Sequence, residues 1–182
     1  MRVITGTARG RKLITLEGND VRPTTDKVKE AMFSAIQFEI EGARVLDLFC
    51  GSGQLGLEAL SRGAAYCTFV DQSRDAQNVT RENLQATGLS KNSKVAAMDA
   101  MAFLQSTQGG FDIALLDPPY GKELVSTALP RLAEKMSDSG VIICETAVTD
   151  ELPETVGDFA AVRNRRYGKI MLTIYRKPPE EN

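Results

Sequence analysis

The sequence predicts an α/β fold, with a mostly parallel sheet of seven strands, helices on both faces and a C-terminal antiparallel hairpin. Three observations predict it. Short apolar runs alternate with amphipathic stretches from residue 44 to residue 145, as in repeated βαβ units. A glycine-rich turn follows the first of these runs. Two further long runs flank Tyr167-Gly168, a pair typical of a hairpin turn.

The expected elements follow from hydrophobic spacing and from turn residues. A helix over 26–38 carries apolar side chains at helical spacing, with its cap at Thr24 or Thr25. We expect strands over 44–49, 66–70, 94–98, 111–116 and 141–145. Between and after them we expect helices over 54–62, 73–87, 100–105 and 123–136, the last kinked or interrupted at Pro130. The hairpin strands cover 159–166 and 169–176.

The chain of 182 residues is long enough for one well-buried domain. We expect a basic N-terminal extension over 1–22, in a small hairpin or mobile, a main domain over 23–177 and a disordered tail over 178–182. No apolar stretch is as long as a membrane span, and the first residues lack the apolar core of a signal peptide. We therefore expect a cytoplasmic protein. Separately, we expect a monomer.

Charge is distributed unevenly along the chain. The formal net charge is −2, but residues 1–29 carry a net +4 and residues 159–177 a net +6. Clustered positive charge supplies much of the affinity for nucleic acid, although a single basic strand is more often solvated surface. Two separate basic segments favour a nucleic-acid partner.

Cysteine and histidine usage excludes several kinds of site. The three cysteines, Cys50, Cys67 and Cys144, are far apart and lie in apolar runs, which indicates buried reduced thiols. The chain has no histidine, the commonest general base and a favoured metal ligand. Both observations argue against hydrolase triads and metal chemistry, so we expect no metal.

The most informative motif is Asp117-Pro118-Pro119-Tyr120, which directly follows the apolar run 111–116. Open α/β sheets bind their ligands outside the carboxyl ends of strands. Each proline fixes φ and removes an N–H donor, so the motif leaves a carboxylate and carbonyls as acceptors beside an aromatic ring. Such a corner suits a planar amino group, and its alternative reading is an ordinary proline turn with a packed tyrosine.

The glycine turn and three acids predict a cofactor site. Asp47 begins the run Asp47-Leu48-Phe49-Cys50-Gly51-Ser52-Gly53-Gln54-Leu55-Gly56, Asp71 ends the second strand before Gln72, and Asp99 ends the third before Ala100. An acid just before the turn suits a cationic amino-acid moiety better than a pyrophosphate. A carboxylate after the second strand can bind ribose hydroxyls, and one after the third can accept from an adenine amino group. This set suits S-adenosylmethionine.

Each acid also has a structural alternative. Asp47 could bond the amides of the glycine turn, Asp71 could simply end a strand, and Asp99 could cap the following helix. These alternatives stay open for each acid alone.

Together these motifs resemble the RsmD-like family of bacterial 16S rRNA guanine-N2 methyltransferases, which use S-adenosylmethionine on a class I, Rossmann-like fold. The resemblance rests on residues 2–6, 9–13, 22–33 and 45–53 and on the Asp-Pro-Pro-Tyr motif, and so covers nearly the whole chain. Gln54-Leu55-Gly56 departs from the usual family pattern, but the three glycines are kept.

The resemblance implies a role for each motif. Residues 47–53, with Phe49, Gly51, Ser52 and Gly53, would hold the methionine part of the cofactor, and Asp71 with Gln72 its ribose. Asp99 with Ala100 would flank the adenine, and Asp117 would adjoin both cofactor and acceptor. The RNA contacts implied by the basic segments are Arg2, Arg9, Arg11, Lys12, Arg22, Thr24, Arg165 and Arg166, the partner being 16S rRNA or the small subunit particle.

In the mechanism that this implies, Asp117 and the Pro118 carbonyl accept the two N–H groups of the acceptor and Tyr120 stacks on the flipped base. The proton leaves after alkylation, so no histidine is needed. Three alternatives remain. A DNA or other RNA amino-methyltransferase acting on adenine N6 or cytosine N4 would use the same corner. A protein glutamine methyltransferase would carry Asn at Asp117, and a non-catalytic RNA-binding protein would be expected to lose Asp117 or the glycines.

Overall fold

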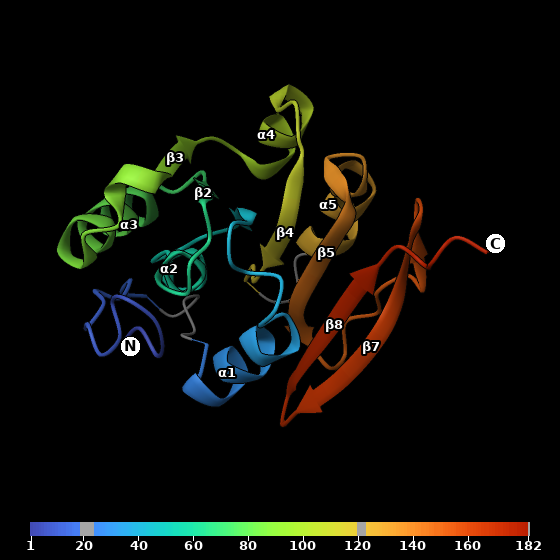
Figure 1. Ribbon diagram of the computed structural model, residues 1–182, viewed down its shortest axis with the longest axis horizontal. Coiled ribbons are helices and arrows are strands. Elements are labelled where there is room, and N and C mark those ends of the chain that lie inside the picture. Colours follow the sequence, from blue (N-terminus) through green and yellow to red (C-terminus); the bar gives the residue numbers. More distant parts are fainter. Residues whose placement is uncertain (19–23, 120–122, 182) are drawn as a thin grey trace.

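The computed structural model describes residues 1–18, 24–119 and 123–181, and its sheet lies between two helical layers (Figure 1). Within these ranges the sheet has eight strands in the order β3-β2-β1-β4-β5-β8-β7-β6. They are β1 (Arg44–Leu48), β2 (Tyr66–Asp71), β3 (Ser93–Ala97), β4 (Phe111–Leu116), β5 (Met136–Ala147), β6 (Thr155–Val156), β7 (Phe159–Tyr167) and β8 (Ile170–Arg176). Strands β1 to β5 are parallel to one another, and β8, β7 and β6 each pair antiparallel with a neighbour.

Helices cover both faces of the sheet, as expected. They are α1 (Asp26–Ala35), α2 (Gln54–Ser61), α3 (Arg74–Thr87), the 3-10 turn η1 (Ser90–Asn92), α4 (Ala100–Ser106) and α5 (Leu124–Ala133). One core cluster joins α1, α2 and α3 to one face, where Met32, Leu57 and Ile143 are buried together. The other joins α4 and α5 to the opposite face, where Leu104 and Leu129 are buried. In the described parts of the chain no helix is long and apolar enough to cross a membrane.

Three boundaries differ from the expected ones by three residues or more. Helix α1 ends at Ala35 because Phe38, the last apolar residue of its expected range, is 93% exposed instead of joining the core. Strand β5 begins at Met136, which pairs with Phe111, and polar residues 137–139 hide this start from a hydrophobicity pattern. Helix α5 accordingly ends at Ala133.

Two further expectations need correction. Strand β6 was not expected, because two residues are too short to give a periodic signal. Pro130 lies inside α5 without interrupting it. Pro130 is exposed to solvent. The carbonyl four residues earlier in the helix, which lacks an N–H partner because of the proline, can therefore accept a hydrogen bond from water.

The first 13 residues fold back on themselves as a hairpin-like loop, one of the two expected outcomes. Arg2 and Lys12 form one antiparallel bridge, and the Val3 amide donates to the Arg11 carbonyl at 2.9 Å. Val3 and Leu13 are buried in the core shared by α1, α2 and α3. We call residues 1–13 the N-terminal loop; the division of the chain at residue 22 stays a prediction.

The strand order fixes where ligands can bind. The chain leaves β3 at one edge and returns to β4 on the other side of β1, so the order reverses between β1 and β4. In open α/β sheets the binding crevice lies outside the carboxyl ends of the strands at such a point. The glycine turn follows β1 and Asp117 follows β4, so both predicted motifs meet there.

Candidate active site

The Asp117-Pro118-Pro119 motif directly follows β4, which lies between β1 and β5 in the sheet. Leu116, the last residue of β4, pairs with Leu48 on β1 and with Cys144 on β5. The residues that follow, Asp117 and Glu145 among them, therefore lie side by side at the carboxyl edge of the sheet. Asp117 is partly exposed, Pro118 is buried and Pro119 is exposed, whereas Glu145 is fully buried.

Thr24 joins the two carboxylates. Its Oγ1 lies 2.6 Å from Asp117 Oδ2 and 3.0 Å from Glu145 Oε2. Thr24 is only 4% exposed. It directly precedes Thr25, whose side chain caps α1. Thr24, predicted as an RNA contact, is therefore buried beside two carboxylates, and a contact with RNA stays a prediction.

Sequence reasoning did not assign Glu145 a role. A signal was present: Glu145 is a charged residue at the end of an otherwise apolar buried run, 141–144. Its meeting with Asp117 depends on strand register, which hydrophobic pattern alone does not supply.

A cavity of about 440 Å³ adjoins the two prolines of the motif. The start of α5, the end of β5 with Glu145 and Thr146, and the segment after β5 with Leu152 form its other walls. This volume falls in the range of ligand-binding pockets, roughly 300–1,000 Å³. The hydroxyl of Thr146, a residue that lines the cavity, is buried and has no hydrogen-bond partner in the described parts of the chain.

The structure shows why glycine occupies three positions of the glycine turn, Gly51, Gly53 and Gly56. Gly51 and Gly53 have φ of +56° and +82°, in a region of backbone conformation that residues with a side chain rarely adopt. Phe49 has φ of +68° although it is not a glycine, which marks local strain next to the site. Gly56 instead allows close packing, because an added Cβ would lie 2.3 Å from the Phe69 ring. The turn is thus fixed by both backbone conformation and helix–strand contact.

Asp47 is buried beneath the glycine turn and accepts a hydrogen bond from the first turn of α2. Its Oδ2 accepts the Gly56 amide at 2.9 Å, and the residue is 1% exposed. Burial raises the pKa of this carboxyl well above its usual value, the Gly56 hydrogen bond opposes that shift, and the nearby Asp117 and Asp71 carboxylates add to it. This contact is the structural alternative considered for Asp47, and its contact with a cofactor stays a prediction.

Asp71 also supports the turn, yet remains accessible. Its two carboxylate oxygens accept the Gly51 amide at 3.0 Å and the Ser73 amide at 2.9 Å, and the residue is partly exposed. Each oxygen keeps a further lone pair, so the carboxylate can still accept ribose hydroxyls. The next residue, Gln72, is exposed beside it.

Asp99 caps α4, since its carboxylate accepts the Ala102 amide at 3.1 Å. Asp99 is exposed, two residues after the end of β3, and Ala100 is buried. The helix-capping role considered for Asp99 is therefore confirmed. The rest of this carboxylate is open to solvent.

Gln54, the first residue of α2, was not among the predicted site residues. Its side-chain oxygen is buried and has no hydrogen-bond partner within the described residues, although it directly follows Gly53. A buried acceptor without a partner costs free energy, about 1–3 kcal/mol, unless a ligand satisfies it. Gln54 could bind a cationic or N–H group of a cofactor in the turn. Ser52, 7% exposed, instead donates to the Met1 sulfur at 3.4 Å.

The cysteines behave as expected. Cys50, Cys67 and Cys144 are free and buried, and burial raises the pKa of each thiol. Among the described residues, no group of histidine, cysteine and acidic side chains could hold a metal ion.

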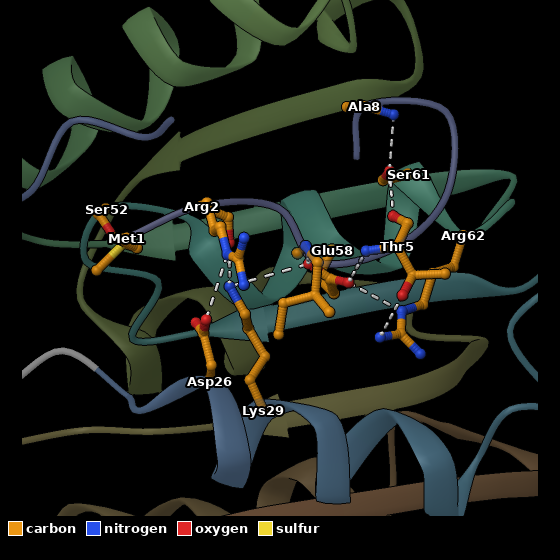
Figure 2. A network of polar contacts seen from close by, with 12 residues as sticks. Met1, Arg2, Thr5, Ala8, Asp26, Lys29, Ser52, Glu58, Ser61 and Arg62 are labelled. Atoms are coloured by element: carbon orange, nitrogen blue, oxygen red, sulfur yellow. Dashed lines mark hydrogen bonds and ion pairs between the residues drawn. The ribbon is translucent and has the colours of Figure 1, made fainter. Parts of the chain in front are cut away.

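The N-terminal loop is attached to the main domain through Glu58 (Figure 2). This fully buried carboxylate accepts the Ile4 and Thr5 amides at 2.9 and 3.0 Å and the Arg62 Nε at 3.0 Å. Lys29 Nζ lies 3.9 Å from it and donates to the Arg2 carbonyl at 2.6 Å. Burial lowers the pKa of the Lys29 ammonium, and the Glu58 carboxylate partly offsets that shift. The loop is therefore held by charge-assisted hydrogen bonds rather than by apolar packing alone.

The predicted RNA contacts lie in two separate places. Arg9, Arg11 and Lys12 are exposed on the N-terminal loop, and Arg165 and Arg166 are exposed on β7. Arg2 is also exposed but pairs with Asp26 at 3.3 Å. The loop and β7 lie on opposite sides of the molecule, with α1 between them (Figure 1). Two of the predicted site residues, Arg22 and Tyr120, lie outside the described residues.

Comparison with known proteins covers almost the whole chain. The model of a family described as Conserved hypothetical protein 95 matches residues 1–176. YlbH of Bacillus subtilis is 42% identical over 182 residues, covering 97% of this chain and 99% of the relative. Ribosomal RNA small subunit methyltransferase D of Escherichia coli K12 is 34% identical over 179 residues, covering 97% of this chain and 90% of the relative.

The fold is also found in solved structures. The Escherichia coli protein yhhF superposes with a TM-score of 0.87 at 34% identity, covering 99% of each chain. This similarity confirms the expected α/β methyltransferase fold, with one short strand more than expected.

Proposed function

The chain belongs to the family described as Conserved hypothetical protein 95, and from this membership and its site we propose that it methylates the exocyclic N2 amino group of a guanine in 16S ribosomal RNA, with S-adenosylmethionine as methyl donor. The observation that carries the proposal is the meeting of the Asp117-Pro118-Pro119 corner and the glycine turn at the β1/β4 switch point. Relatives in Escherichia coli and Haemophilus influenzae are named ribosomal RNA small subunit methyltransferase D, which supports the acceptor. An RNA substrate of this kind supports a cytoplasmic location.

The residues present fit the proposed cofactor. Asp71 offers a partly exposed carboxylate for a ribose, and Asp99 an exposed one near the adenine position. The buried, unsatisfied oxygen of Gln54 provides an acceptor for the methionine ammonium. Bound S-adenosylmethionine would supply an electrophilic methyl group. The three sites follow three different strands of the sheet, as an extended nucleoside with an amino-acid tail requires.

The corner residues would activate the acceptor nitrogen. An aromatic amino group is a weak nucleophile because its lone pair is delocalised into the ring. The Asp117 carboxylate and the Pro118 carbonyl would each accept one N–H, which favours a pyramidal nitrogen and directs its lone pair at the methyl group. These hydrogen bonds would strengthen toward the transition state. As the N–C bond forms, the methyl–sulfur bond would break with its electron pair left on the sulfur, and the alkylated nitrogen would then lose its proton to water.

The lining of the cavity beside the corner supports guanine. Its wall includes Glu123, Glu145, Asp150 and Glu151. The Watson–Crick edge of guanine presents two neighbouring donors, N1–H and the N2 amino group, whereas adenine and cytosine present a ring acceptor beside their amino group. An acidic wall therefore favours guanine over the other two amino-bearing bases.

The direct test is methyl transfer from labelled S-adenosylmethionine to naked 16S RNA and to small-subunit particles, both from a strain lacking the gene. We expect one labelled N2-methylguanine, mapped by nuclease digestion and mass spectrometry. RNA from the wild-type strain is the control, because its site is already modified. Label in N6-methyladenine or N4-methylcytosine would overturn the guanine assignment and favour the alternative amino-methyltransferase.

A further inference from the structure

The contacts of Asp117 support an inference that rests on the proposed function and deepens it. We propose that Thr24 is a positioning residue: its hydroxyl fixes the Asp117 carboxylate in the orientation that receives the acceptor amino group. Thr24 and Asp117 are 93 residues apart in the chain, so only the fold brings them together.

The first argument is the geometry of the contact. Thr24 Oγ1 lies 2.6 Å from Asp117 Oδ2, within the 2.5–2.7 Å typical of a hydroxyl that donates to a carboxylate. Such charge-assisted bonds are about twice as strong as neutral ones. Thr24 is 4% exposed, so water competes little for this hydrogen bond.

The second argument is that Thr24 is itself held in place. Its Oγ1 lies 3.0 Å from Oε2 of the fully buried Glu145. A hydroxyl has a single proton, which Thr24 shares between the two carboxylates, with the shorter bond to Asp117. The β-branched side chain restricts χ1, so the hydroxyl has few other orientations. Glu145 and the rotamer preference thus make Thr24 a rigid support for Asp117.

The third argument separates this role from helix capping. The adjacent Thr25 already caps α1, because its side chain accepts the Val28 amide at 3.3 Å. The start of the helix therefore does not require the Thr24 hydroxyl. Thr24 is also poorly placed to bind an RNA phosphate. It is buried, and the two carboxylates beside it repel negative charge.

Catalysis is sensitive to such positioning. Asp117 acts in the proposal through hydrogen bonds that improve as the nitrogen becomes pyramidal, and a misplacement of about 1 Å can lower a rate by about 10²-fold. Loss of the hydroxyl should therefore affect turnover rather than binding.

The test compares Thr24→Val, which keeps the shape but removes the hydroxyl, with Thr24→Ser, which keeps the hydroxyl. We expect Thr24→Val to lower kcat by about 10- to 100-fold while KM for RNA and Kd for S-adenosylmethionine change less than about twofold. Thr24→Ser should recover most of the lost kcat. The matched control is Thr25→Val, which should lower the melting temperature through loss of the cap and leave kcat within about twofold.

Three results would overturn the proposal: full kcat in Thr24→Val, an effect confined to KM for RNA, or a Thr24→Ser enzyme as slow as Thr24→Val. Failure of the proposed function would look different, because the wild type itself would then not methylate guanine in ribosomal RNA. The same variants would in that case be compared on the adenine- or cytosine-containing nucleic acid that the wild type methylates, since every amino acceptor needs Asp117 in the same orientation.

Discussion

Asp117 provides the acceptor for the reacting amino group in the proposed mechanism, so its replacement separates chemistry from binding. We expect Asp117→Ala to lower methyl transfer by at least about 10³-fold, because both the hydrogen bond and its charge are lost. Binding of S-adenosylmethionine, measured by calorimetry, should remain nearly intact, since the glycine turn and Asp71 lie on other strands. Full activity in this variant would overturn the mechanism.

Asp47 gives a residue-scale prediction about stability. Burial is the main reason that the pKa of its carboxyl lies well above the usual 3.8. The folded state therefore keeps a proton that the unfolded chain has lost, and the free energy of unfolding falls as pH rises from about 4 through the folded pKa. Asp47→Asn cannot titrate and should lack this fall.

The measurement is urea unfolding of wild type and Asp47→Asn between about pH 4 and pH 8. The stability difference in favour of Asp47→Asn should increase with pH over this range. Glu30→Gln, at an exposed position on α1, is the control and should run parallel to wild type. Parallel curves for Asp47→Asn would show that the buried carboxyl titrates as an ordinary one.

At the scale of elements, the attachment of the N-terminal loop depends on Gly6. Its φ is +92°, and an added Cβ would lie 1.8 Å from the Ser61 carbonyl oxygen on α2. Gly10, with φ of +81°, has nothing within 4 Å of the same added atom. Both glycines have a positive φ, but an added Cβ meets a neighbouring group only at Gly6.

We expect Gly10→Ala to cost about 1 kcal/mol in the free energy of unfolding and Gly6→Ala about 2–4 kcal/mol, because only the second adds a clash to the backbone strain. Urea denaturation of the two variants measures the difference. Equal costs would mean that the loop shifts away from α2 without resistance, which the Glu58 hydrogen bonds oppose.

At the scale of the whole molecule, the two basic segments should act as separate RNA contacts. Neutralising Arg9, Arg11 and Lys12 to glutamine should weaken RNA binding and reduce the slope of log K against log salt by about 2, at about 0.7 per lost phosphate contact. Neutralising Arg163, Arg165 and Arg166 on β7 should do the same. Because α1 lies between the segments (Figure 1), the two effects should add.

The matched control removes three exposed charges elsewhere, at Arg81, Lys91 and Lys94 around α3 and β3. This triple variant should leave the salt slope within about 0.5 of wild type. An unchanged affinity in the Arg9, Arg11 and Lys12 variant would remove the N-terminal loop from the RNA site.

Local patterns predicted most of the fold. The apolar runs and turn residues gave all five parallel strands and the hairpin, because these elements bury continuous or alternating apolar faces. Strand β6 and the start of β5 were missed, since a two-residue strand and a polar strand end carry no periodic signal. Pro130 does not interrupt α5, because an exposed position lets water replace the lost hydrogen bond.

The sequence by itself determined the chemistry available at this site: an acid, two prolines and a glycine turn, each directly after a strand. Local order along the chain suffices for that, because the carboxyl ends of parallel strands share one edge of the sheet. Only the tertiary structure decided which groups surround them. Strand register placed Glu145 level with Asp117, and packing of the segment before α1 brought Thr24 between them. Such contacts join residues 93 and 121 positions apart, and no local pattern records them.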